Sequence, residues 1–151
     1  MSRLSAQGIT VDVPAGWDVR IYLRDAVPGE TTHAVLHAAT FPLPGRRGDY
    51  GSGAVEAMGN DDIFAAMVEF DPAHAGDRLF AAAGVPVRLP AQSFSPSSLQ
   101  RRISGQLGTQ RFFHDAGRAF CLYVVLAGAA AGLADEASSF VAGISISGHR
   151  S

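Results

Sequence analysis

The chain has 151 residues, is 47% hydrophobic and 17% charged, and carries a formal net charge of −2. This balance is typical of a folded globular protein and excludes a disordered chain, and the charge argues against a dedicated nucleic-acid-binding protein. All twelve basic residues are arginines, which excludes every mechanism that needs a lysine, such as a Walker-type phosphate site or a Schiff base.

Alternating apolar residues open the chain. Ile9, Val11 and Val13 alternate with polar residues, a Pro-Ala-Gly turn follows at 14–16, and the alternation resumes over 17–24. Two such runs on either side of a Pro/Gly turn predict a β-hairpin with one buried face. A further turn is expected over 27–30.

A third strand and a glycine-rich loop come next. Residues 33–41 predict a strand, which Pro42 stops. The loop 45–53 contains four glycines and two arginines. Residues 54–58 predict one or two helical turns capped by Ser52.

The middle of the chain is less regular. The apolar residues of 61–70 fit either a helix stripe or one face of a strand, and the short length between two turn signals favours the strand. Residues 72–109 predict a loop-rich segment that contains a short strand over 85–89 and a single turn near 97–102.

The last third predicts a second hairpin and a helix. Strands are expected over 109–114 and 118–127, joined by a turn at 115–117. A helix ending near Gly143 follows, because apolar residues recur along one helical face at Leu133, Ala137, Phe140, Val141 and Ile144.

Length and element order together predict the architecture. A chain of this size without repeats or linkers suits one domain over residues 1–151. Strands that come mostly as hairpins, with few helices, predict an α+β fold: a mostly antiparallel sheet with helices packed on it and one helix near the C-terminus.

The order of these features resembles the PsbP/DcrB/LpqN-like superfamily of small α/β/α sandwiches. The resemblance is carried by the turn Pro14-Ala15-Gly16-Trp17 after the opening strand, a strand near 33–41, the late hairpin at 115–122 and the closing helix. Residues 45–105 lie outside it. It implies a non-enzymatic protein that binds protein partners, assists assembly or acts as a chaperone, and it transfers no catalytic residue.

The candidate chemical groups do not converge. On a strand, His33 and His37 share a face but lie roughly 13 Å apart, too far to bind one metal ion. His114 and Asp115 point to opposite faces of their strand. The Asp and His residues of 71–77 are typical of a turn, and residues 143–147 lack the second glycine of a serine elbow. The sequence therefore predicts no catalytic residue, no metal ligands and no cofactor.

Two arginine-containing segments are candidates for partner binding. In the loop 45–53 these are Arg46, Arg47 and Tyr50, although a backbone phosphate cradle is a second interpretation of its glycines. Arg101 and Arg102 begin a basic segment that fits an acidic partner. We expect a protein partner rather than a nucleic acid.

The cellular compartment is inferred from features that the sequence lacks. Cys121 is the only cysteine, stands in an apolar run and is expected to be buried without a disulfide. The first residues lack the apolar core of a secretion signal, which predicts a cytoplasmic protein. The uncharged stretch 119–134 is shorter than the roughly 20 residues of a spanning helix, so no membrane span is expected.

The leading functional hypothesis is a non-enzymatic protein-binding domain, acting as a chaperone, adaptor or assembly factor. One alternative is a small ligand-binding protein or enzyme with a pocket under the 45–53 and 71–77 loops. A second alternative is a self-associating component of a larger assembly, and hence a homo-oligomer.

Overall fold

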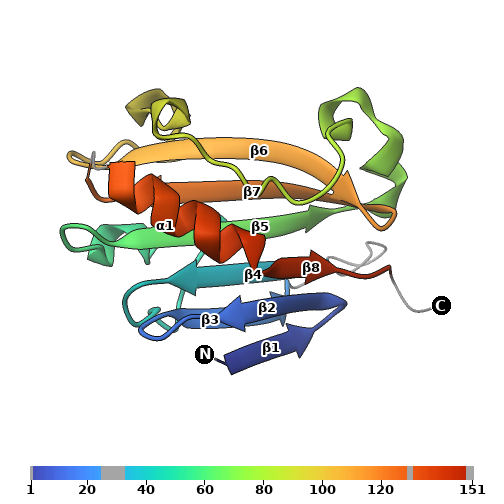
Figure 1. Ribbon diagram of the computed structural model, residues 1–151, viewed down its shortest axis with the longest axis horizontal. Helices are drawn as coiled ribbons and strands as arrows, with labels where there is room; N and C mark the ends of the chain where they lie inside the picture. Colours follow the sequence, from blue (N-terminus) through green and yellow to red (C-terminus); the bar gives the residue numbers. More distant parts are fainter. Residues whose placement is uncertain (1, 25–32, 129–130, 149–151) are drawn as a thin grey trace.

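The computed structural model describes residues 2–24, 33–128 and 131–148, in which eight strands and one helix are present (Figure 1). The predicted turn at 27–30 lies outside these residues. The α+β class, the antiparallel sheets and the helix near the C-terminus are confirmed. The elements are β1 (Ser2–Ala6), β2 (Ile9–Val13), β3 (Asp18–Leu23), β4 (Ala34–Ala39), β5 (Ile63–Phe70), β6 (Leu107–Asp115), β7 (Arg118–Leu126), α1 (Ala131–Ala142) and β8 (Ile144–Ile146).

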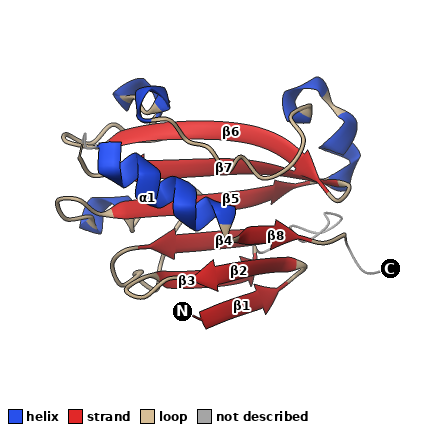
Figure 2. Cartoon of the chain, in the orientation of Figure 1, coloured by secondary structure: helices blue, strands red, loops and turns tan. Residues whose placement is uncertain are grey.

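The strands form two sheets. The larger has the order β3-β4-β5-β7-β6 and the smaller β1-β2-β8, and all neighbours are antiparallel (Figure 2). Every residue of β4 and β7 is buried. This explains why both segments are apolar runs rather than alternating sequences, since both faces of the larger sheet are covered.

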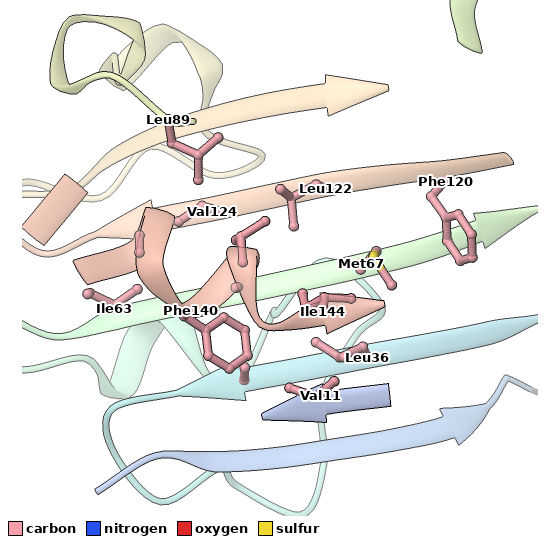
Figure 3. Packing of buried hydrophobic residues seen from close by; sticks show 14 of the residues in the cluster. Val11, Leu36, Ile63, Met67, Leu89, Phe120, Leu122, Val124, Phe140 and Ile144 are labelled. Carbon is pink, nitrogen blue, oxygen red and sulfur yellow. The ribbon is translucent and has the colours of Figure 1, made fainter. Parts of the chain in front are cut away.

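One face of the larger sheet packs against α1 and the smaller sheet. Figure 3 shows this core, in which Val11 of β2, Phe140 of α1 and Ile144 of β8 lie over side chains of β4, β5 and β7. The Trp17 ring stacks on Phe140 with centroids 4.3 Å apart and planes 3° from parallel. A single core therefore includes both sheets and the helix.

Loops cover the opposite face of the larger sheet. A second apolar cluster there contains Phe64, Tyr123 and Val125 of the sheet together with Leu43 and Val55 from the loops. Leu99 and Ile103 pack against the same cluster. We call this surface, formed by residues 41–58 and 99–106, the loop-covered face.

The predicted first hairpin is wrong in its pairing, although both of its strands exist. β2 pairs with β1 on one edge and β8 on the other, which leaves no edge for β3, and β3 pairs with β4 in the other sheet. The turn between them is closed by the Trp17 amide donating to the Pro14 carbonyl at 3.2 Å. Both strands bury apolar residues in one core, so their alternation alone could not show that they belong to different sheets.

The small sheet contains two strands that the sequence analysis did not predict. β1 has mostly exposed side chains and therefore no apolar pattern. The helical spacing places Ile144, the first residue of β8, on the helix, but the chain leaves the helix at Gly143, whose amide donates to the Phe140 carbonyl at 3.0 Å. Ile144 then pairs with Val11. The predicted helix end at Gly143 is confirmed, while the placement of Ile144 on the helix is wrong.

Some of the remaining predictions are confirmed and others are wrong. Strand β5 over 61–70 and the β6–β7 hairpin are confirmed, and the turn near 97–102 corresponds to a short 3-10 helix, η5 (Pro96–Ser98). Residues 85–89 form no strand. The turn at 54–58 exists as η1 (Val55–Ala57), but its capping by Ser52 is wrong, because Ala54 occupies the cap position and makes no side-chain cap bond.

A buried ion pair ties the larger sheet to the chain beyond β8. Arg118 and Glu69 are 1% and 0% exposed, and the guanidinium donates Nε to Oε2 at 2.9 Å and Nη2 to Oε1 at 3.0 Å. Arg118 Nη1 also donates to the Ser147 carbonyl at 3.0 Å, and its carbon lies 5.2 Å from the centroid of the Phe120 ring. The Glu69 carboxylate further accepts from the Ala34 amide.

Candidate functional site

His37 attaches the 45–53 loop to the larger sheet. It is fully buried in β4, its Nδ1 accepts from Arg47 Nε at 2.8 Å, and its Nε2 lies 2.8 Å from the Asp49 carbonyl oxygen. A carbonyl only accepts and the Arg47 Nε–H only donates, so the neutral tautomer with its proton on Nε2 is required. Burial lowers the pKa of His37 to about 4, which keeps this ring neutral at pH 7.

A second set of bonds holds the same loop to β3. The Tyr22 hydroxyl donates to Asp49 Oδ1 at 3.0 Å, and Arg24 Nη1 lies 3.5 Å from Asp49 Oδ2. Arg47 also donates Nη1 to the Pro44 carbonyl. Burial, together with the bond to Asp49, raises the pKa of the Tyr22 hydroxyl, so Tyr22 remains a donor across the ordinary pH range. The 45–53 loop is thus hydrogen-bonded to side chains of two strands, β3 and β4.

The backbone of this loop is used internally. The Gly48 amide donates to the Ser52 carbonyl, the Gly51 amide to the Gly48 carbonyl, and the Gly53 amide to Glu56 Oε1. A phosphate cradle needs several adjacent amides that point outward without partners. The three that bond within this segment are not available, so the cradle interpretation finds no support here.

The three candidates in this loop have different surroundings. Arg46 is exposed and lines an open hollow of about 550 Å³ with Arg47. Arg47 is half-buried and bonded to His37. Tyr50 is half-buried, with its ring centroid 6.0 Å from that of Tyr123. Of the three, only Arg46 presents its side chain mainly to solvent.

Arg101 and Arg102 lie on the same face as the 45–53 loop. Arg101 Nη1 is 2.8 Å from Glu56 Oε2, which joins the segment after η5 to η1. Arg102 is exposed and, among the described residues, forms no ion pair. The structure therefore brings the two predicted segments together through Glu56 and leaves Arg102 with an unneutralised charge.

A groove of about 400 Å³ begins beside Arg102. Pro96, Ile103, Leu107 and Gly128 contribute to its lining, which is almost entirely apolar. Its walls are fixed, because Ser95 and Gly108 exchange two backbone hydrogen bonds of 2.8 and 3.0 Å and the Gln100 amide donates to the Tyr123 hydroxyl at 2.7 Å. The groove is thus bordered by segments that are bonded to the larger sheet.

Gln106 borders this groove and anchors it to η1. The side chain is 6% exposed, and its Nε2 donates to the Val55 carbonyl at 2.8 Å. The carbonyl can only accept, so the orientation of the carboxamide is determined. Gln106 Oε1 is buried and has no donor among the described residues.

The other candidate groups are occupied by local structure. In the described part of the chain, no three His, Cys, Asp or Glu side chains gather closely enough to bind a metal ion. His74 and Asp77 form an exposed pair at 2.7 Å within one turn, and His114 Nδ1 lies 2.6 Å from the Phe80 carbonyl oxygen. These contacts are those of turns and loop anchors.

The 45–53 and 71–77 loops meet β5 at different points. Gly51 lies against Phe64 near the start of β5, whereas 71–77 follows the end of that strand at Phe70.

Sequence reasoning missed Gln106 and the Arg118–Glu69 pair. For the pair a signal existed, since Glu69 and Arg118 are charged residues at the ends of apolar runs. For Gln106 none existed, because its burial depends on a carbonyl contributed by Val55, far away in the chain.

Comparison with known proteins gives no relative for this chain. No family model, no curated protein and no solved structure matches it. Among the residues that the structure describes, no helix is long and apolar enough to cross a membrane. The uncharged stretch 119–134 is divided between β7 and α1.

Proposed function

We propose that this chain is a non-enzymatic protein-binding domain that docks its partner on the loop-covered face. The observation that carries the proposal is the apolar groove beside Arg102. An apolar depression bordered by an arginine is a common centre of protein interfaces.

The surrounding surface fits the same role. Arg46 and Arg102 are exposed arginines on segments that are held firmly to the sheet, and Arg101 lies between them through its contact with Glu56. A rigid surface loses little conformational entropy when a partner binds. Arg46, Arg47, Tyr50, Arg101 and Arg102 therefore remain our proposed contact residues, with Arg47 and Tyr50 acting by holding the loop in place.

The resemblance to the PsbP/DcrB/LpqN-like superfamily supports the same class of function. That resemblance implies partner binding, assembly or chaperone activity, and it is part of this proposal together with a cytoplasmic location. In the fold, the turn at 14–17 contacts the closing helix through the Trp17–Phe140 stack.

Site-specific photo-crosslinking in the source cell tests the proposal. The photoreactive residue p-benzoylphenylalanine replaces Arg46 or Arg102 on the loop-covered face, and Gln92 serves as the control. Gln92 is exposed in η4 (Ala91–Ser93), which packs against α1. We expect one defined protein to crosslink from positions 46 and 102 and not from 92. No crosslinked protein, or equal crosslinking from all three, contradicts the proposal.

The same experiment separates the other hypotheses. A crosslink to a second copy of this chain indicates self-association. A small-molecule site is favoured by one observation, the volume of the groove, which is within the range of ligand pockets. That function is expected to appear as an added mass on the purified chain in native mass spectrometry, without a crosslinked protein.

A further inference from the structure

We propose that the groove beside Arg102 binds an extended acidic peptide segment of the partner. In this complex a bulky apolar side chain fills the groove and a neighbouring carboxylate pairs with Arg102. This inference rests on the proposed function and specifies the chemistry of the partner.

The lining determines the first feature of the occupant. The groove walls near Pro96, Ile103 and Leu107 expose almost only carbon, so a polar group placed there would lose its hydration without gaining a hydrogen bond. A volume of about 400 Å³ accommodates a large aliphatic or aromatic side chain. The depression is open to solvent, so the rest of the occupant extends along the surface.

Shape determines the second feature. The groove is an open depression rather than an enclosed cavity. An extended peptide places one side chain in such a depression while its backbone lies along the surface.

Charge determines the third feature and the orientation. Arg102 has no acidic partner among the described residues, whereas Arg101 is paired with Glu56. A carboxylate oxygen of Asp61 adjoins the Gly128 side of the groove, because a Cβ built on Gly128 would lie 3.3 Å from it. An acidic residue is thus favoured next to Arg102 and disfavoured next to Gly128. Arginine and carboxylate form paired, charge-assisted hydrogen bonds.

Selection of random twelve-residue peptides by phage display on the full chain tests this inference. We expect enriched sequences that place Asp or Glu close to a bulky apolar residue. A synthetic peptide of the consensus is expected to bind about 10-fold more weakly to the Arg102→Glu variant, and less than about 2-fold more weakly to Arg88→Glu. Arg88 is exposed outside the groove and provides the matched charge reversal.

A further measurement tests the groove itself. Ser104→Trp, at an exposed position of the lining, is expected to block binding.

Several results overturn the inference: no enriched peptide, a basic or wholly polar consensus, or binding unaffected by both Arg102→Glu and Ser104→Trp. These results are distinguishable from failure of the proposed function. If a partner crosslinks from positions 46 and 102 while the peptide tests fail, protein binding stands and the acidic peptide is excluded. If peptides bind at the groove but no protein crosslinks in the cell, the proposed function fails instead.

Discussion

His37 connects the stability of the protein to pH. Unfolded, this histidine titrates near pH 6.5, whereas burial lowers its pKa to about 4 in the folded chain. Between these values the unfolded state binds a proton that the folded state does not, so stability falls as the pH is lowered from 6.5 to 4. We expect this residue to contribute a loss of up to about 3 kcal/mol over that range. Urea unfolding measured at several pH values gives the slope.

A conservative replacement separates His37 from the other titrating groups. Glutamine can accept from Arg47 and donate to the Asp49 carbonyl as the imidazole does, but it does not titrate. His37→Gln is therefore expected to flatten the dependence between pH 6.5 and 4. An identical slope in wild type and His37→Gln would refute the assignment.

The buried pair of Arg118 and Glu69 makes a prediction about stability. Removing one partner leaves the other charge buried, so Arg118→Met is expected to cost about 3–5 kcal/mol of unfolding free energy. Replacing both, in Arg118→Met with Glu69→Leu, is expected to recover much of that loss. The exposed pair Arg3–Asp12 is the control, and Arg3→Ala is expected to cost less than about 1 kcal/mol. Chemical denaturation measures all four proteins.

Among the elements, the 45–53 loop depends on a close approach at Gly51. This glycine has φ +93°, and a Cβ there would overlap the Phe64 ring. Gly51→Ala is expected to cost about 1–3 kcal/mol. Gly45→Ala, in the same loop with open space around it, is expected to change stability by less than about 0.5 kcal/mol. Equal midpoints of urea unfolding for the two variants would show that the loop is not held against Phe64.

Local patterns predicted most elements, and they failed where pairing depends on distant residues. The alternation over 9–13 and 17–24 located β2 and β3, but the partner of β2 on one edge is β8, which lies beyond the helix. Ile144 continued the helical spacing and was assigned to the helix, because a strand of three residues has no pattern of its own. Fold class was therefore predictable, whereas the assignment of strands to sheets was not.

The candidate site was predictable only in part. Arg46, Arg101 and Arg102 were found because exposed arginines in loops are visible in a sequence. The groove was not found, because it is produced by the packing of the segment after η5 on the start of β6, where the Cβ of an alanine at Gly108 would lie 2.8 Å from Leu99. Such contacts depend on three-dimensional packing that residue types do not reveal.

On the scale of the whole molecule, the shared core predicts cooperative unfolding. One apolar cluster joins α1 to strands of both sheets. The only tryptophan in the sequence, Trp17, packs against this cluster and stacks on Phe140 of the helix. We expect unfolding followed by Trp17 fluorescence and by far-ultraviolet circular dichroism to give coincident transitions, as for a single domain. Two separate midpoints would show that the sheets unfold independently.

The pairing of β2 with β8 also affects the order of assembly during synthesis. Val11 leaves the ribosome long before Ile144, its partner in the small sheet, and at roughly 5–20 residues per second the delay is on the order of ten seconds. Throughout this interval one edge of β2 lacks its partner strand, and Ile9 and Val11 lack part of their cover. The small sheet is thus completed only after every strand of the larger sheet has been made, and β2 is exposed to wrong pairing until then.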